Sequence, residues 1–280
     1  MIIDSQTNFV YISTLLIRHQ AFCRQFLYLL QEFNVGWSVV ENTNDIWCRD
    51  YMPVQVNENK FVQFEFDPDY LLPKKYLHLK TKPELVYCFV PVNSTKSNLV
   101  IDGGNIVKWK NKIIVTDKIY SENPDFSNIE IRRQLRLALE IDEVIAIPKE
   151  PYDVFGHADG MVKFIDENKV LLNDYSRIYP SLHKKLIKIF SDYNIETVLL
   201  PYRIFNRIGK DKISSAKGNY INYLQLEKLI LIPEYGIQED EIAYSVMKNT
   251  FQNYNIRQIN CNSIAAEGGV LNCMSWSLKR

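Results

Sequence analysis

The chain has 280 residues, of which 46% are hydrophobic and 24% charged, a composition typical of folded globular proteins and unlike that of disordered chains. Its 33 Lys and Arg residues balance 33 Asp and Glu residues, so it lacks the broad positive field that binding to nucleic acid or anionic membranes usually requires. No apolar stretch approaches the roughly 18 residues of a membrane-spanning helix. The N-terminal segment has no basic leader, and the five cysteines form no CxxC pair. We therefore expect a reduced, cytoplasmic protein without a signal peptide, disulfide framework or structural zinc site.

The predicted elements repeat in the order strand, strand, helix, strand. A strand over residues 8–13 precedes the first helix, which is indicated by apolar residues at helical spacing between Phe22 and Phe33. Similar stripes predict helices around residues 131–139, 182–193 and 242–247. Each helix is followed by a short predicted strand, over residues 37–41, 143–147, 196–200 and 256–260. Residues 66–98 show no clear helical stripe, so their elements are not predicted.

Polar dipeptides mark the tips of predicted β-hairpins, because each precedes an apolar run suited to a strand. They are Asn59-Lys60, Asn111-Lys112, Asn168-Lys169 and Glu227-Lys228. Their lysines are 52, 57 and 59 residues apart, a period that indicates a repeat architecture. The last block, from Glu267, supplies one strand, which we expect to pair with residues 8–13 and remove the open sheet edges. The sequence thus predicts a single α/β domain over residues 1–280, a five-bladed propeller around a central pocket, closed by its N- and C-terminal strands.

Residues that differ between the repeated blocks are the candidates for function. Trp47 and Asp50 open the first block, His157 and Asp159 open the third, and Cys273 lies on the predicted final strand. Residues two apart in a strand face the same side, so His157 and Asp159 are expected to point together. Equivalent positions of a ring converge on its axis. We therefore expect these five side chains to meet in one pocket.

Such a pocket suits a substrate with a guanidinium group. Asp50 and Asp159 can hold a planar cation through charge-assisted hydrogen bonds, and Trp47 can cover its face. Cys273 as a thiolate is a strong nucleophile, and a neighbouring cation lowers the pKa of a thiol. His157 can transfer a proton near neutral pH. Together the residue types indicate attack on a guanidinium carbon.

Five segments of the chain carry a resemblance to a known family. In order, DIWCRDYMPV, DGGN, GHADGMVKF, GNYINY and EGGVLNC resemble the motifs of the agmatine deiminase and Porphyromonas-type peptidylarginine deiminase family, whose members have the five-bladed pentein fold. The resemblance implies that Cys273 is the nucleophile, His157 the general acid and base, and Asp50 and Asp159 the guanidinium-binding carboxylates. It also implies hydrolysis of a guanidino group to a ureido group and ammonia through a covalent cysteine thiouronium, with no metal or organic cofactor. Agmatine, converted to N-carbamoylputrescine, is the default substrate of that family.

The chain departs from the family pattern at Met52, Asp102, Lys163 and Asn272, where Gly, Glu, Arg and His are usual. We interpret the segment at Asp102 as architectural, because paired glycines serve tight backbone geometry. Arg49 is expected to support Asp50, while Cys48 is expected to point away from Trp47 into packing. The remaining cysteines are expected to be small buried apolar residues: Cys23, Cys88 and Cys261.

A basic stretch over residues 201–219 leaves the identity of the substrate undecided. It holds Arg203, Arg207, Lys210, Lys212 and Lys217, opposed only by Asp211. If this stretch lines the mouth of the pocket, it would repel the distal ammonium of agmatine and attract a carboxylate. The alternative is that it is a solvated loop. Arginine or peptidylarginine therefore remain alternative substrates.

Other functional classes remain to be separated from a deiminase. An amidinotransferase would share fold and nucleophile, and a non-enzymatic pentein would bind partners through its ring surface but has no need for this set of residues. A cysteine protease is disfavoured, since peptide hydrolysis does not need two carboxylates facing the substrate. We expect a small guanidino compound as partner and neither nucleic acid nor membrane, and an assembly of identical copies is compatible with the sequence.

Overall fold

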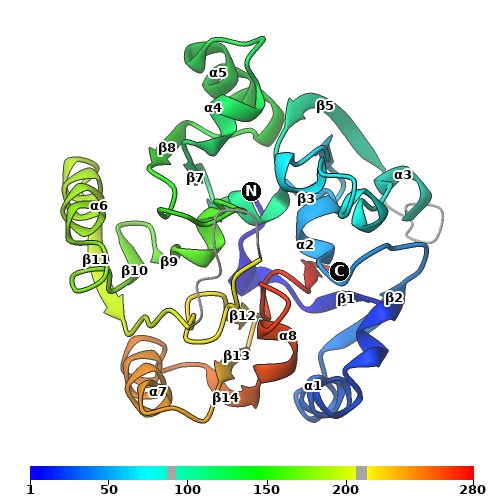
Figure 1. Cartoon of the computed structure of the whole chain (residues 1–280), viewed down its shortest axis with the longest axis vertical. Coiled ribbons are helices and arrows are strands. Elements are labelled where there is room, and N and C mark those ends of the chain that lie inside the picture. The colour runs from blue at the N-terminus through cyan, green and yellow to red at the C-terminus, as the bar shows by residue number, and fades with distance from the viewer. Residues whose placement is uncertain (87–92, 206–212) are drawn as a thin grey trace.

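The structure is a computed structural model that describes residues 1–86, 93–205 and 213–280. Within that part of the chain, five three-stranded sheets surround a central axis, and the longer helices lie at the periphery (Figure 1). Each middle strand pairs antiparallel with one neighbour and parallel with the other. The predicted five-unit α/β ring is therefore confirmed.

The strands follow the chain around the ring. The first sheet has the order β15 (Trp276–Leu278), β1 (Phe9–Ser13), β2 (Gly36–Val40), and the second β3 (Val54–Gln55), β4 (Phe61–Glu65), β5 (Ser94–Val100). The third comprises β6 (Val107–Trp109), β7 (Lys112–Thr116) and β8 (Glu143–Ile147). The fourth comprises β9 (Val162–Asp166), β10 (Lys169–Asn173) and β11 (Glu196–Leu200), and the fifth β12 (Leu224–Gln225), β13 (Leu229–Glu234) and β14 (Asn255–Asn260). The predicted hairpin tips all fall between antiparallel neighbours.

Pairing of the two ends of the chain closes the ring. β15 lies antiparallel to β1, with Tyr11 opposite Trp276 and Phe9 opposite Leu278. The rings of Tyr11 and Trp276 are 5.1 Å apart, so side-chain packing adds to the backbone hydrogen bonds. This confirms the predicted pairing and leaves β2 as the outer strand of the first blade.

Amphipathic helices cover the blades, as their apolar stripes predict. They are α1 (Gln20–Glu32), α5 (Asn128–Leu139), α6 (Pro180–Asp192) and α7 (Glu239–Thr250). In α1 the buried face includes Phe26 and Leu30, and in α6 it includes Leu186 and Phe190. Ser127 begins α5 by accepting a hydrogen bond from the amide of Glu130. None of the described helices is long and apolar enough to cross a membrane.

The second blade has no long helix among its described residues. Between β4 and β5 lie the 3₁₀ turns η3 (Asp69–Leu71) and η4 (Leu77–Leu79) and the single turn α3 (Pro83–Val86). Hence residues 66–98 lacked a helical stripe. Cys88, expected to be buried, lies outside the described residues.

Short helical turns stand where extended strands were expected near the axis. Trp47 directly precedes α2 (Cys48–Tyr51), and His157 directly precedes the 3₁₀ turn η7 (Ala158–Gly160). A similar turn, η6 (Gly103–Asn105), precedes β6, and Cys273 lies in a turn before β15. The strand assignment of His157, Asp159 and Cys273 was therefore wrong. The blades crowd together at the axis, where a Cβ on Gly103 would overlap the carbonyl oxygen of Arg49. Helical turns fit this space because they reverse the chain in fewer residues than strands do.

Candidate active site

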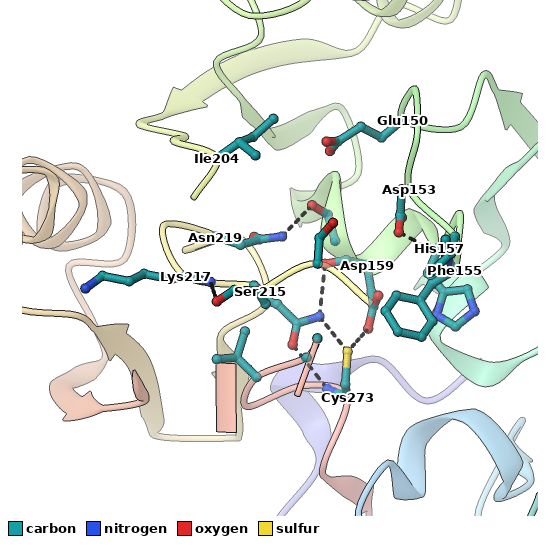
Figure 2. A pocket seen from close by; sticks show the side chains of 18 of the residues that line it. Glu150, Asp153, Phe155, His157, Asp159, Ile204, Ser215, Lys217, Asn219 and Cys273 are labelled. Carbon is teal, nitrogen blue, oxygen red and sulfur yellow. Dashed lines mark hydrogen bonds between the residues drawn. The ribbon is translucent and has the colours of Figure 1, made fainter. Parts of the chain in front are cut away.

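The turns at the centre of the ring line one pocket of about 900 Å³, including the part open to solvent. All five residues singled out from the sequence line it: Trp47, Asp50, His157, Asp159 and Cys273. They come from the first, third and last blocks of the repeat, so ring geometry and not sequence proximity brings them together. Figure 2 shows Cys273, Asp159 and His157 on the same side of the pocket.

Cys273 is held by two polar neighbours. Its Sγ lies 3.1 Å from Nδ2 of Asn222 and 3.6 Å from Oδ2 of Asp159, and its backbone amide donates to Oδ1 of Asn222 (Figure 2). Burial raises the pKa of the Cys273 thiol well above its ordinary value, and the carboxylates of Asp159 and Asp50 raise it further. Burial and the nearby carboxylates therefore favour the protonated thiol over the thiolate.

His157 lies between two carboxylates. Its Nε2 is 2.7 Å from Oδ2 of Asp102, and its Nδ1 is 3.6 Å from Oδ1 of Asp50. Burial opposes the charged form, but Asp50 and Asp102 outweigh this effect and raise the pKa of His157 to about 9. The imidazole is thus positively charged at neutral pH and has a proton to donate.

The two carboxylates facing the thiol differ in their surroundings. Asp159 accepts a hydrogen bond of 2.7 Å from Nδ2 of Asn272, which fixes the carboxylate beside the sulfur. Asp50 accepts a hydrogen bond of 3.1 Å from the backbone amide of Gly104. Burial raises the pKa of Asp50, and the nearby carboxylates add to this, whereas the positive His157 opposes it. A cation bound between Asp50 and Asp159 would relieve the repulsion between them.

The segment at Asp102 was interpreted as architectural, and the structure adds that Asp102 contacts His157 directly. The paired glycines after it do serve geometry: a Cβ on Gly104 would lie 2.6 Å from Oδ1 of Asp50 and 2.7 Å from Nδ1 of His157. The DGGN segment thus supplies both a hydrogen-bond partner for the imidazole of His157 and, through Gly104, the space that this imidazole needs. The acidic residue before a glycine pair was the signal that sequence reasoning undervalued.

Asn222 and Asn272 were not among the expected site residues. Asn222 belongs to the GNYINY segment, and Asn272 is adjacent to Cys273. Arg49, expected to support Asp50, instead donates to Asn272 (3.3 and 3.4 Å) and to Oγ of Ser277 (3.2 Å). Hydrophobic periodicity does not identify polar residues of this kind, which position the candidate catalytic groups through side-chain amides.

Trp47 and Cys48 have different environments. Trp47 is half-buried at the pocket, where a Cβ on Gly269 would come within 2.7 Å of its ring. Cys48 is fully buried and lies 3.3 Å from the hydroxyl oxygen of Tyr51. Packing was thus the right expectation for Cys48, although a one-turn helix and not strand alternation turns it away from the pocket. Cys261 is likewise buried, while Cys23 is half-buried.

The pocket has an acidic and aromatic far end, across from Cys273 in Figure 2. Glu150 is only 5% exposed and accepts hydrogen bonds from the hydroxyls of Tyr175 (2.9 Å) and Tyr202 (3.0 Å). Asp153 also lines this end and caps its own turn by accepting from the amides of residues 155 and 156. A cation on the end of a substrate would meet complementary charge here.

Both ends of the basic stretch reach this pocket, and its described cations, Arg203 and Lys217, line the pocket while also contacting other residues. Arg203 lies 3.3 Å from Oε1 of Glu239, and the ammonium of Lys217 lies 5.3 Å from the ring centre of Phe205. Figure 2 shows Lys217 extending away from Cys273. Three cations and the opposing acid of this stretch lie outside the described residues: Arg207, Lys210, Lys212 and Asp211.

No group of three or more His, Cys, Asp or Glu side chains is arranged to hold a metal ion in residues 1–86, 93–205 and 213–280. The pocket described above brings together a thiol, an imidazole and carboxylates.

The chain matches the model of the family described as Porphyromonas-type peptidyl-arginine deiminase over residues 10–278. Among curated proteins, it is 21% identical to the agmatine deiminase of Pseudomonas aeruginosa over 293 residues, which cover 85% of this chain and 75% of that protein.

Solved structures of low identity share the fold. A substrate-bound, cysteine-to-serine variant of Campylobacter jejuni agmatine deiminase is similar with a TM-score of 0.82 at 15% identity, covering 100% of this chain and 96% of that one. A citrulline complex of a DDAH variant from Pseudomonas aeruginosa gives a TM-score of 0.60 at 12% identity, covering 98% of this chain and 100% of that chain. The architecture is that of the penteins.

Proposed function

The chain belongs to the Porphyromonas-type peptidyl-arginine deiminase family, and on this basis we propose that it is a guanidine deiminase that converts agmatine to N-carbamoylputrescine and ammonia. The observation that carries the proposal is the contact of Cys273 with Asp159 in a pocket that also holds His157 and Asp50. A thiol beside carboxylates gains reactivity only when a cation joins them, and guanidinium is such a cation.

Substrate binding activates the nucleophile in this proposal. The guanidinium lies between Asp50 and Asp159, with Trp47 against its face. Its positive charge offsets the two carboxylates that raise the pKa of the Cys273 thiol. The thiol then loses its proton, and the thiolate lies next to the electrophilic carbon.

The reaction proceeds in two halves. The Cys273 thiolate forms a bond to the guanidinium carbon, and His157 gives its proton to a terminal nitrogen as the bond from carbon to that nitrogen breaks and ammonia leaves. The neutral His157 then takes a proton from water, whose oxygen attacks the covalent thiouronium carbon. The bond from carbon to sulfur breaks and the remaining hydroxyl proton leaves to solvent, which restores the thiolate and releases the neutral ureido product. In total, one water is consumed and one ammonia is released.

The far end of the pocket supports an amine-bearing substrate. Glu150 and Asp153 line this end. Arg203 and Lys217 also line the pocket, but Arg203 is paired with Glu239 and Lys217 extends away from Cys273. A primary ammonium complements two carboxylates, while the carboxylate of arginine would be repelled by them. These two carboxylates favour agmatine over arginine.

The test is an assay of ureido product and ammonia with agmatine, arginine and a peptidylarginine, with no amine acceptor added. We expect agmatine to be preferred and Cys273→Ala to lose about 1000-fold or more in kcat. Cys23→Ala is the matched control and should retain activity, because Cys23 lies on α1 away from the pocket. Undiminished turnover by Cys273→Ala would remove the nucleophile, and product formed only with an added amine would identify an amidinotransferase.

A further inference from the structure

A second cavity lies behind the active-site carboxylate Asp159. Its volume is about 430 Å³, including the part open to solvent, and Asp159 lines both this cavity and the active-site pocket. The 3₁₀ turn η1 (Asp4–Gln6) lies at its edge, and the inner strands β6, β9 and β12 contribute its walls. The charged residues that line it are Asp4, Arg49, Lys108, Asp159 and Lys163.

Two of the three cations in this cavity are well bonded. Lys163 donates to the backbone oxygen of Tyr223 (2.9 Å), to Oδ1 of Asn272 (3.2 Å) and to Oδ2 of Asp4 (3.1 Å). Arg49 donates to Asn272 and Ser277 as described above. Both cations are therefore fixed in place, and their charges remain in the cavity.

Lys108 is different. Its side chain is 7% exposed, and its ammonium lies 3.8 Å from Oδ1 of Asp4, which is too far for a hydrogen bond. In the described part of the chain, that Asp4 oxygen has no hydrogen-bond partner, and neither has the buried Nε1 of Trp109, which also lines the cavity. Donor groups that line a cavity and have unused hydrogen-bonding capacity are the elements of an anion site.

The charges do not balance. Arg49, Lys108 and Lys163 contribute three positive charges, and Asp4 and Asp159 contribute two negative ones, so one positive charge is in excess. A buried unpaired charge is unfavourable unless a counter-charge joins it. Burial lowers the pKa of Lys108 to about 8, with Arg49 and Lys163 adding to the effect and Asp4 opposing it. A single negative charge in the cavity would balance this excess and raise the pKa of Lys108 back towards its ordinary value.

We propose that this cavity binds one monovalent inorganic anion of about the size of chloride, held mainly by Lys108. The site is connected to the catalytic centre through Asn272, which accepts from Lys163 and Arg49 and donates to Asp159. Occupancy therefore stabilises the polar network that holds Asp159 beside Cys273. The inference concerns a separate site and does not depend on which guanidino compound is the substrate.

The first test measures thermal unfolding of the full chain at constant ionic strength, with chloride replacing gluconate. We expect a saturable rise in melting temperature of about 3 °C or more in the wild type and none in Lys108→Met. Lys112→Met is the matched control, because Lys112 is also buried but bonds to the backbone oxygen of Glu167 and does not line the cavity. It should keep the chloride response.

The second test is a crystal of the wild type grown or soaked with bromide, which locates the ion by anomalous scattering and needs no variant to fold. A bromide peak among Lys108, Arg49 and Trp109 supports the proposal. Absence of a peak, or a chloride response that is equal in wild type and Lys108→Met, overturns it. Neither readout uses turnover, so failure here is distinct from failure of the proposed deiminase activity.

Discussion

Oδ2 of Asp102 lies 2.7 Å from Nε2 of His157, although 55 residues separate them in the chain. Asp102 stands before the central turn of one blade and His157 before that of the next. The contact pairs a buried imidazole with a buried carboxylate, and it is the main hydrogen bond that stabilises the charged ring. Proton transfer at the site therefore depends on the junction between two blades.

Removing this carboxylate should move the alkaline limit of activity. In Asp102→Asn the pKa of His157 falls from about 9, because an interaction that favours the imidazolium is lost, so His157 loses its proton at lower pH. We expect the alkaline limb of the kcat/KM profile for agmatine to shift down by about one pH unit or more. Asp102→Glu keeps the negative charge and should return the alkaline limb of the kcat/KM profile towards its wild-type pH. An unshifted limb in Asp102→Asn would show that His157 is not the acid whose titration limits activity.

Gly104→Ala should damage the site more than the fold. The added Cβ would approach the side chains of Asp50 and His157 to 2.6 and 2.7 Å, and both must move. Because a misplacement of about 1 Å in catalytic groups can cost about 100-fold in rate, we expect a loss of that order in kcat/KM. Circular dichroism and melting temperature monitor the fold. Gly160→Ala is the control for stability, since its Cβ would meet only Nδ2 of Asn219 at an ordinary 3.6 Å.

Glu150→Gln tests recognition of the distal ammonium. Loss of the negative charge should lower kcat/KM for agmatine by about 10- to 100-fold, because a charged hydrogen bond contributes about 1.5–3 kcal/mol. Butylguanidine has the same guanidinium but no ammonium, so its turnover should change little. An equal loss for both compounds would mean that Glu150 supports the pocket structurally through Tyr175 and Tyr202 instead of binding the amine.

Asp45 should make stability depend on pH. Its side chain is 8% exposed and accepts from the amide of Trp47, and burial raises its pKa from 3.8 to about 7. The folded state then binds more protons than the unfolded state between about pH 4 and 7, so this group lowers stability as pH rises through that range. The full effect corresponds to about 4 kcal/mol.

In Asp45→Asn that pH-dependent loss disappears, while the amide oxygen can still accept from Trp47. The free energy of unfolding of Asp45→Asn relative to wild type, measured by urea denaturation, should therefore be higher at pH 8 than at pH 5. An equal difference at both pH values would contradict the assignment.

Hydrophobic periodicity and hairpin tips predicted most of the fold. The strands Glu143–Ile147 and Glu196–Leu200 agree with the predicted ranges, and the helix stripes mark the buried faces of α1 and α6. These features depend on local patterns, which the chain repeats from blade to blade. Pairing of β1 with β15 followed from an incomplete last repeat, which left each terminal strand without a partner.

The central turns could not be predicted in the same way. Strands were expected at Asp159 and Cys273, but crowding at the axis imposes helical turns, and this crowding arises only when the blades assemble. The contacts of Asn272 with Asp159 and Lys163 also join residues over 100 positions apart. Long-range polar contacts of this kind have no local sequence signature, which is why Asn222 and Asn272 were not among the expected site residues.

The pairing of β1 with β15 places Asn8 against Arg280, whose backbone amide and oxygen both bond to the Asn8 side chain. The ring is therefore closed by its own terminal strands. The residues that line the central pocket come together because of the spatial order of the blades and not because of their order in the sequence. A circularly permuted chain, with a short linker across this junction and new ends at the Asn168-Lys169 hairpin tip, retains every blade and every central turn. We therefore expect that the chain ends can be moved to another hairpin tip while the arrangement of the pocket residues is kept.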